Sequence, residues 1–323
     1  MDYITWFDEA PEPGLLDAGG KGASLCKLIR GGFSVPGGFI IRSGMFERFM
    51  QENGLREKAL EMAGGIDFDN YSELVATSQE IRDMITGTSM PPEFDAMIRE
   101  SYLKLGGDGT PLIEDHPVAV RSSGTAEDLD EASFAGQQDT FLYVTGASDV
   151  SRYVKECWAS LYNDRALFYR KSKSFDEATI SIAVVIQRMI AAEKAGVMFT
   201  VEPITQNRGV CLIEGTWGLG EAIVSGSVTP DSYTVDKTGK LLDVFISEKE
   251  IMVVRKAGGK GVEELDVPEE KRELQVLDET EIKNLADMAV RLEEFFGKPQ
   301  DVEWAIVGKE LYLLQSRPIT TLN

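Results

Sequence analysis

Histidine is almost absent from this 323-residue chain, and cysteine is scarce. The one histidine, His116, precedes a proline and has neither a Ser or Cys nucleophile at motif spacing nor metal-ligating neighbours, which favours a structural role over a catalytic one. The three cysteines, Cys26, Cys157 and Cys211, lie far apart without metal-ligand spacing. We expect them to be reduced core thiols, as in a cytosolic protein.

Positive charge and long apolar runs are also in short supply. Lys and Arg number 33 against 54 Asp and Glu, a formal net charge of -21. Such a surface repels nucleic acids and anionic membranes, so we exclude both as partners, and an anionic ligand would have to be held by a few placed cations. No apolar run approaches the about 18 residues of a membrane span, and the acidic N-terminus has no signal-peptide apolar region. The predicted location is the cytoplasm.

The remaining composition is that of a globular chain long enough for two lobes, with 43% hydrophobic and 27% charged residues. The pattern changes from helix-rich to strand-rich near residues 187–196. We therefore predict an N-terminal lobe over 1–190, with a structural helical insertion at about 43–105, and a C-terminal lobe over 191–323. The predicted fold class is α+β.

The stretch 301–317, DVEWAIVGKELYLLQSR, has the pattern of a β-hairpin with a short Gly-containing loop. In the register that keeps apolar side chains together, Glu303 lies opposite Gln315 and Asp301 lies opposite Arg317. The apolar residues then share the other face: Val302, Trp304, Ile306, Tyr312 and Leu314. Two oxygen ligands beside a guanidinium suit a magnesium-bound polyphosphate. The alternative is a solvated edge face with an ordinary ion pair.

Two further stretches carry a cation beside glycine or small hydroxyl residues. Gly19-Gly20-Lys21-Gly22 leads into a helical pattern, where backbone amides and the Lys21 ammonium can hold phosphate. A Gly-rich turn with a solvated lysine is the alternative. Arg121 ends the apolar strand 117–121 and precedes SSGTAED at 122–128, which we expect to form a loop that closes over phosphates.

No Walker A motif is present, because Leu15 and Gly22 stand where that motif requires glycine and a hydroxyl residue. The apolar run 182–186 predicts a central buried strand, whose end can offer backbone groups to a purine edge. The segment 132–141 runs into a strand that starts at Thr140, and it is either a mobile lid or a plain loop.

With these residues in view, the chain resembles the N-terminal ATP-binding domain of the phosphoenolpyruvate synthase, pyruvate phosphate dikinase and rifamycin phosphotransferase superfamily. The matching motifs follow the family's order: GGKGASL at 19–25, AVRSSGTAEDLDEASFAGQQDTF at 119–141, GVMFTVEPIT at 196–205, GLGEAIVSGSVTPDSY at 218–233, KPQDVEW at 298–304 and QSRPIT at 315–320. Details such as CWASLYNDRA at 157–166 look most like the rifamycin phosphotransferase branch. The phosphoenolpyruvate synthase branch stays open.

The resemblance implies a two-lobed ATP-grasp fold with the nucleotide in the cleft between the lobes. By position, it implies ATP-binding roles for Lys21, Arg121, Gly136, Thr140, Phe141, Gln187, Glu303, Gln315 and Arg317. Among these, Glu303 and Gln315 are the implied Mg²⁺ ligands. Lys21, Arg121 and Arg317 are the implied catalytic cations. The implied ligands are therefore ATP and Mg²⁺.

The resemblance also implies a partner. In this superfamily a swivelling domain carries a histidine in a T-S-H context that takes the phosphoryl group from ATP, and neither that motif nor a match for it at His116 occurs here. We therefore expect phosphorylation of a histidine on a separate domain, in cis or in trans, giving AMP and phosphate, with onward transfer to a small organic acceptor. The alternatives are a non-catalytic nucleotide-binding subunit or regulatory module, a domain of a longer enzyme, and a split-gene subunit of a phenylphosphate synthase-like enzyme.

Overall fold

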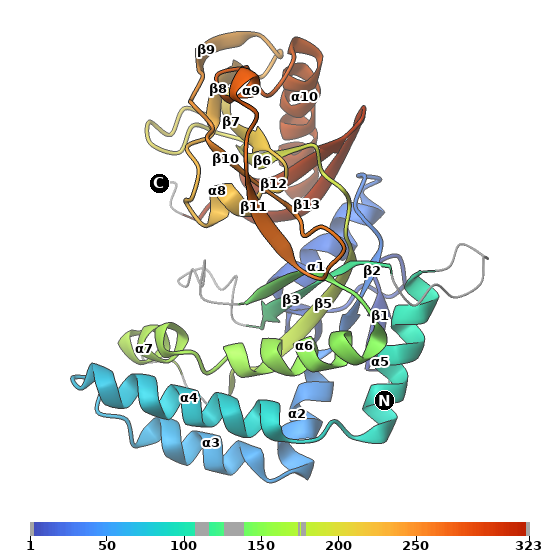
Figure 1. Ribbon diagram of the computed structural model, residues 1–323, viewed down its shortest axis with the longest axis vertical. Helices are drawn as coiled ribbons and strands as arrows, with labels where there is room; N and C mark the ends of the chain where they lie inside the picture. The colour runs from blue at the N-terminus through green and yellow to red at the C-terminus, as the bar shows by residue number, and fades with distance from the viewer. Residues whose placement is uncertain (1–2, 107–115, 126–138, 174, 176–178, 321–323) are drawn as a thin grey trace. The chain divides into compact units, whose positions relative to one another are not determined.

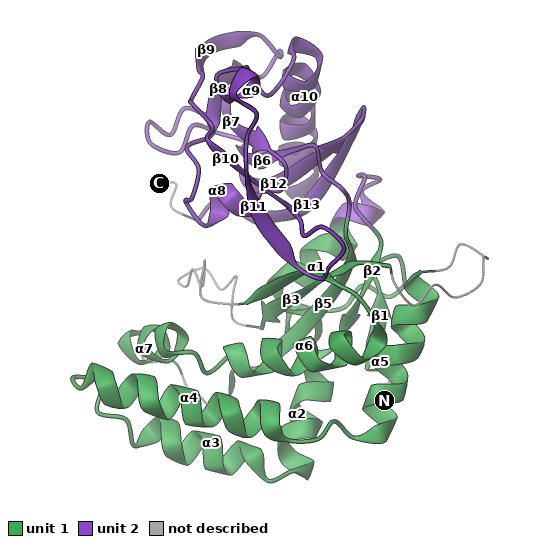
Figure 2. Cartoon of the chain, in the orientation of Figure 1, with its two compact units in different colours: residues 1–27, 37–189 green, residues 28–36, 190–323 purple. Residues whose placement is uncertain are grey.

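The computed structural model describes residues 3–106, 116–125, 139–173, 175 and 179–320, and the chain divides into two compact units. Unit 1 comprises residues 1–27 and 37–189, and unit 2 comprises residues 28–36 and 190–323 (Figure 2). The short segment 28–36 thus belongs to unit 2 although the residues on either side of it belong to unit 1. Both units combine helices with antiparallel sheet, so the predicted mixture of helix and sheet is confirmed.

Unit 1 is built on a five-stranded antiparallel sheet in the order β1-β2-β5-β3-β4 (Figure 1). The strands are β1 (Ile4–Trp6), β2 (Gly38–Ile41), β3 (Val118–Gly124), β4 (Thr140–Val144) and β5 (Ile182–Arg188). The helices are α1 (Leu15–Arg30), which continues into unit 2, α2 (Ser43–Glu52), α3 (Leu55–Gly64), α4 (Tyr71–Gly87), α5 (Pro92–Leu105), α6 (Ala147–Ser160) and α7 (Asp164–Ser172). The central strand β5 is buried from Ile182 to Gln187, as its unbroken apolar run predicts.

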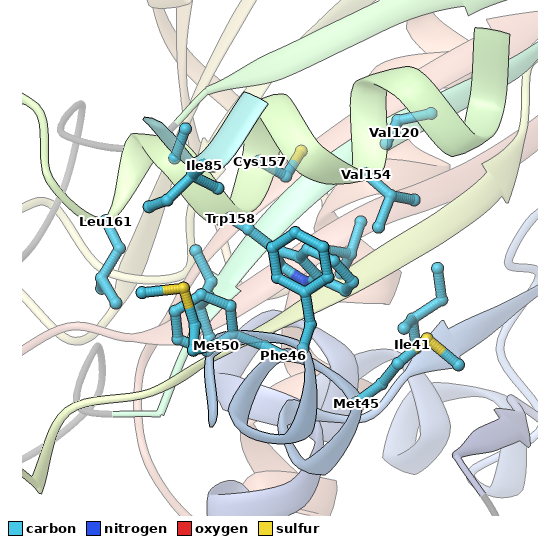
Figure 3. Close-up of a cluster of buried hydrophobic side chains, with 14 of the residues drawn as sticks. Ile41, Met45, Phe46, Met50, Ile85, Val120, Val154, Cys157, Trp158 and Leu161 are labelled. Atoms are coloured by element: carbon cyan, nitrogen blue, oxygen red, sulfur yellow. The ribbon is translucent and has the colours of Figure 1, made fainter. Parts of the chain in front are cut away.

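The two faces of this sheet carry different side chains. Val118 and Val120 of β3 face a large apolar core with α2, α5 and α6, in which Figure 3 shows Val120, Phe46 and Trp158. The Trp158 ring lies 4.9 Å from that of Phe49. The opposite face packs against α1, since a Cβ on Gly22 would lie 3.0 Å from Cδ1 of Ile40. Because side chains alternate along a strand, the odd-numbered positions of β3 lie on this α1 face.

Unit 2 is built on a six-stranded antiparallel sheet in the order β13-β12-β6-β7-β8-β9. The strands are β6 (Lys194–Phe199), β7 (Val210–Trp217), β8 (Asp231–Asp236), β9 (Leu241–Phe245), β12 (Gln300–Val307) and β13 (Glu310–Pro318). A separate ribbon pairs β10 (Ile251–Arg255) with β11 (Val262–Asp266), and the helices are α8 (Glu221–Val224), α9 (Glu269–Arg272) and α10 (Glu279–Phe296). In the described ranges, no helix has the length and apolar character needed to cross a lipid bilayer.

Helix α10 covers one face of the unit 2 sheet. That face carries fully buried apolar side chains, including Met198, Ile213 and Trp304. The Trp304 indole has room because Gly196 has no side chain, and a Cβ there would lie 2.5 Å from Cζ2 of the ring. With Trp304 fixed in this core, its neighbour Glu303 points to the face away from α10.

A fully buried ion pair anchors the β10–β11 ribbon to the sheet. The Lys249 ammonium lies 2.5 Å from Oδ1 of Asp231, and both side chains are inaccessible to solvent. The other carboxylate oxygen of Asp231 accepts hydrogen bonds from the Val276 amide (2.8 Å) and the Tyr233 hydroxyl (3.0 Å). Removing one partner of such a buried pair generally lowers the free energy of unfolding by about 3–5 kcal/mol. The network therefore ties the ribbon and the segment before α10 to one residue of β8.

Candidate functional site

Three of the predicted site residues share the α1 face of the unit 1 sheet. The Arg121 side chain is buried, and its Nη1 donates to Oε1 of Gln187 at 3.1 Å. Arg121 pairs with Thr140 on β4 and with Val185 on β5, so Thr140 and Gln187 project to the same side as the guanidinium. The structure thus brings Arg121, Thr140 and Gln187 together, with an orienting contact between the cation and the amide.

The prediction that residues 122–128 form a loop directly after Arg121 is wrong for its first part. β3 continues to Gly124, which pairs with Ile182, so Arg121 lies within the strand and not at its end. The Ser122 hydroxyl donates to the Asp139 carbonyl (3.0 Å) and the Ser123 hydroxyl donates to the Ala18 carbonyl (2.8 Å). Both hydroxyl groups therefore make hydrogen bonds within unit 1.

Lys21 lies on α1 directly after a break in the helix. Gly19 has φ 66° and ψ 174°, which is outside the helical region and strained for residues with a side chain. A Cβ on Gly19 would lie 2.2 Å from the Ser123 carbonyl oxygen. The Gly22 amide donates to the Ser123 hydroxyl at 3.2 Å. The turn of α1 that carries Lys21 is therefore fixed against β3, two residues along from Arg121.

Phe141 is not brought to the same side as Arg121. It pairs with Val120, and its ring lies 4.5 Å from that of Tyr153 at the edge of the apolar core. Alternation along β4 sends Thr140 and Phe141 to opposite faces of the sheet, so the Phe141 ring does not lie on the α1 face with Arg121. The implied ATP-binding role of Phe141 stays a prediction. Gly136 lies outside the described residues.

In unit 2, the C-terminal hairpin has the predicted register at its polar end. Glu303 pairs with Gln315 and Asp301 pairs with Arg317. Directly opposed residues share a face of the sheet, so all four project away from α10. The Arg317 guanidinium donates from Nε (2.8 Å) and Nη2 (2.7 Å) to one oxygen of Asp301. The structure therefore brings the carboxylate, the amide and the guanidinium together as the alternation predicts.

At its other end, the hairpin departs from the predicted pattern. The register shifts between Glu303 and Trp304, so that Trp304 pairs with Leu313. Leu313 is fully buried, and Tyr312, which pairs with Ala305, lies on the opposite face. The prediction that Tyr312 and Leu314 share the Trp304 face is wrong, because a β-bulge adds one residue to β13 and reverses the alternation beyond it.

The sequence pattern placed Asp301 opposite Arg317 but indicated no role for it in the candidate site. Its pKa is raised, first by burial and also by the nearby Glu303 carboxylate, while the Arg317 guanidinium acts in the opposite direction. The Asp301 carboxylate that pairs with Arg317 is therefore largely shielded from water. Asp301 orients Arg317, and the alternation that places Glu303 opposite Gln315 also contained this pairing.

Glu214 adds another carboxylate to the same face. It pairs with Val197 on β6, which in turn pairs with Glu303 on β12. The pKa of Glu214 is raised, mainly by burial and also by Asp301. Nothing in the sequence predicted that Glu214 lies on this face, because the order of strands in a sheet does not follow from the alternation of side chains.

The donor set of this face fits a hard divalent cation. The Glu303 carboxylate and the Gln315 amide are the oxygen donors that Mg²⁺ prefers, and they oppose each other in the ladder. Over the described ranges, no group of three or more His, Cys, Asp and Glu side chains could hold a metal ion by itself. A Mg²⁺ bound here would keep sites for oxygens of its ligand.

Comparisons with known proteins identify the family of this chain. The family described as pyruvate phosphate dikinase, AMP/ATP-binding domain, matches residues 16–323. A probable phosphoenolpyruvate synthase of Methanothermobacter thermautotrophicus is 50% identical over 100% of this chain and 47% of the relative. One of Methanocaldococcus jannaschii is 45% identical over 100% of this chain and 27% of the relative. A rifampicin phosphotransferase of Bacillus cereus is 38% identical over 99% of this chain and 36% of the relative.

These matches define an AMP/ATP-binding domain of the kind found in dikinase-type phosphotransferases. More particularly, the chain belongs to the pyruvate phosphate dikinase AMP/ATP-binding domain family. The resemblance drawn from the sequence motifs is confirmed. The chain spans less than half the length of these relatives. The likeness of CWASLYNDRA to the rifamycin branch does not extend to the whole chain, since the two relatives named phosphoenolpyruvate synthase share more identity with it.

Proposed function

We propose that this chain binds Mg-ATP and performs the ATP-consuming half-reaction of a dikinase-type phosphotransferase. A histidine on a separate domain takes what was the β-phosphoryl group, and water supplies the oxygen of the released phosphate. The products are AMP, phosphate and a phosphohistidine. The observation that carries this proposal is the polar face of the C-terminal hairpin, where Glu303 opposes Gln315 and Asp301 orients Arg317.

We infer from the family that the fold is an ATP-grasp fold and that the nucleotide lies between unit 1 and unit 2. In that placement, the unit 1 face supplies Lys21 and Arg121 to the phosphates, while Gln187 borders the adenine. Gln187 also accepts a hydrogen bond from Arg121, so adenine and phosphate contacts are coupled through one side-chain pair. The unit 2 face supplies Glu303 and Gln315 to Mg²⁺.

Catalysis in this proposal rests on positioning and charge neutralisation. When bound, Mg²⁺ neutralises negative charge on the phosphate oxygens. The chain's own cations do the rest: Lys21 and Arg121 hold the polyphosphate, and Arg317 stabilises the charge that develops during transfer. Asp301 keeps the Arg317 guanidinium in one orientation, which lowers the reorganisation needed at the moment of transfer.

The organic acceptor belongs to the second half of the proposed reaction. The greater identity to the two relatives named phosphoenolpyruvate synthase favours their branch over the rifampicin phosphotransferase branch. The proposed location is the cytoplasm.

Calorimetric titration with Mg-ATP, followed by an AMP assay in the presence of a histidine-bearing domain, tests the proposal. We expect saturable Mg-ATP binding by the chain alone and AMP formation only when that domain is added. Binding without AMP would instead support a regulatory module. Absence of Mg-ATP binding would contradict both functions.

Gly19→Ala tests the link between the Lys21 turn and β3. The substitution introduces a Cβ at 2.2 Å from the Ser123 carbonyl and places a side chain at φ 66°. We expect Mg-ATP affinity to fall by about tenfold or more, as expected when about 1.4 kcal/mol of binding energy is lost. Gly14→Ala is the matched control, because a Cβ there would meet nothing within 4 Å. Equal affinities in the two variants would contradict a role for this turn.

A further inference from the structure

Asp301 and Arg317 both lie at the ends of their strands. Asp301 is the second residue of β12, and Arg317 is the last but one of β13. Strand ends open locally unless further contacts hold them. The two hydrogen bonds from the Arg317 guanidinium to the Asp301 carboxylate orient the cation only while both backbones stay in place. The contacts that fix these two strand ends therefore bear on the candidate site.

A buried polar network ties the two strand ends together. Its centre is Thr200, the residue after β6, which is fully buried. The Thr200 amide donates to the Gln300 carbonyl (2.9 Å), and the Gln300 amide donates to the Thr200 hydroxyl (2.9 Å). The side-chain carbonyl of Gln300 accepts from the Ser316 hydroxyl at 2.9 Å. Gln300 and Ser316 directly precede Asp301 and Arg317 in the sequence, so each member of the ion pair is held by its neighbour.

The same network is anchored to α10 and to the turn after β8. The Thr200 hydroxyl donates to Oε1 of Glu293 at 2.7 Å, and Oε2 of Glu293 accepts from the Lys237 ammonium at 3.0 Å. Lys237 also donates to the Thr200 carbonyl. Water competes weakly for hydrogen bonds in such a protected place. We call these five residues, Lys237, Glu293, Thr200, Gln300 and Ser316, the Thr200 network.

The Thr200 network lies on the face of the sheet opposite the candidate metal ligands. Ser316 pairs with Val302, which faces α10. Alternation then places Gln300 and Ser316 on the α10 face, and Asp301 and Arg317 on the other. The network side chains thus point away from a ligand held at the polar face. Any influence they have on that ligand passes through the backbones of β12 and β13.

We propose that the Thr200 network is a positioning device for Arg317: by fixing the ends of β12 and β13, it keeps the guanidinium paired with Asp301. Thr200 and Ser316 are its positioning residues. The consequence for phosphoryl transfer rests on the proposed function, whereas the orientation of the guanidinium is measurable without any reaction. Preorganised charge needs no reorganisation at the moment of transfer, so a loosened Arg317 slows the chemical step more than it weakens Mg-ATP binding.

Thr200→Val tests the proposal, because it removes the central hydroxyl and keeps the shape of the side chain. Orientation is measured in the chain alone, as the hydrogen-exchange rate of the Arg317 Nε–H group by NMR, with the signal assigned by its loss in Arg317→Lys. The single-turnover rate of AMP formation with the histidine-bearing domain and the Kd for Mg-ATP are measured in parallel. Thr216→Val is the matched control. Thr216 lies on β7 of the same sheet and is fully buried, and its hydroxyl makes no hydrogen bond within the described part of the chain.

We expect Thr200→Val to accelerate Nε–H exchange by about tenfold and to slow AMP formation by about tenfold, the effect on a local equilibrium of losing one buried hydrogen bond. Mg-ATP affinity should stay within about twofold of the wild-type value. Thr200→Ser keeps the hydroxyl and should restore both rates, and Thr216→Val should match the wild type. Because Thr200 acts through Arg317, Thr200→Val should slow AMP formation no further in an Arg317→Ala background.

Wild-type Nε–H exchange in folded Thr200→Val would overturn the proposal, as would full additivity with Arg317→Ala. If Thr200→Val does not fold, Ser316→Ala replaces it with the same expectations, since it removes the bond to Gln300 and leaves Thr200 in place. A wild-type chain that forms no AMP would contradict the proposed function. The exchange rates alone would then decide whether the network positions Arg317.

Discussion

Arg317→Ala is expected to lower the rate of AMP formation by about 100- to 1,000-fold at saturating Mg-ATP and partner, the usual effect of deleting one preorganised group that stabilises transition-state charge. The guanidinium is held by two hydrogen bonds to Asp301, while 39% of its side-chain surface remains exposed toward solvent. It is therefore oriented and still accessible to a ligand. Rapid quenching of a single turnover, with AMP quantified by chromatography, measures the effect on the chemical step.

Lys309→Ala is the matched control for this variant. Lys309 lies in the turn of the same hairpin, is exposed, and carries the same charge, so its removal changes the net charge equally without touching the polar face. Arg317→Lys should fall between the two, because an ammonium keeps the charge but not the forked geometry of the guanidinium. Wild-type AMP formation by Arg317→Ala, with an unchanged circular dichroism spectrum, would remove Arg317 from the mechanism.

The pairing of Glu303 with Gln315 could be predicted because strict alternation leaves few choices. Val302 and Trp304 must be buried, and a slip of one residue would have driven Glu303 into their core. The structure has this register. Alternation acts between adjacent residues, so it is visible in the sequence without knowledge of the rest of the fold.

The bulge that follows could not be predicted in the same way. Leu313 and Leu314 are both apolar, and either can fill the position opposite Trp304. The choice is made by packing: Leu313 is fully buried, and its amide donates to the Ser34 carbonyl at 2.8 Å. Ser34 belongs to the segment 28–36, which is remote in sequence. Contacts of this kind exist only once the fold has formed.

The same limit explains the error at the end of β3. Small hydroxyl residues after a cationic strand are typical of phosphate loops, and Ser122 and Ser123 match that pattern. Their hydroxyls instead satisfy the carbonyls of Asp139 and Ala18. The sequence predicted phosphate-binding roles for Arg121 and for the Gly19–Gly22 turn, and those roles stay predictions. That they meet through Ser123 depends on a hydrogen bond between residues 105 positions apart.

Glu303→Gln is expected to raise the Mg²⁺ concentration needed for half-maximal AMP formation by about tenfold or more, and to lower the maximal rate by about 100-fold. The substitution keeps the shape of the side chain and replaces a charged oxygen donor by a neutral one, leaving two amides opposite each other at positions 303 and 315. Hard divalent cations bind amide oxygens more weakly than carboxylates, and metal charge stabilisation at a phosphoryl group is generally worth several kcal/mol. Titration of MgCl₂ at fixed ATP measures both effects.

The charges of the hairpin distinguish loss of the metal contact in Glu303→Gln from loss of the Arg317 orientation. Glu303 is one of the charges that raise the pKa of Asp301, so its neutralisation moves that pKa downward. Asp301 then stays ionised to lower pH, and its pair with Arg317 persists over a wider pH range than in the wild type. A loss of activity in Glu303→Gln therefore reports the metal contact and not the loss of Arg317 orientation. Glu310→Gln, at the exposed turn of the same hairpin, should retain wild-type Mg²⁺ dependence, and an equal shift in both variants would contradict the assignment of Glu303 as a metal ligand.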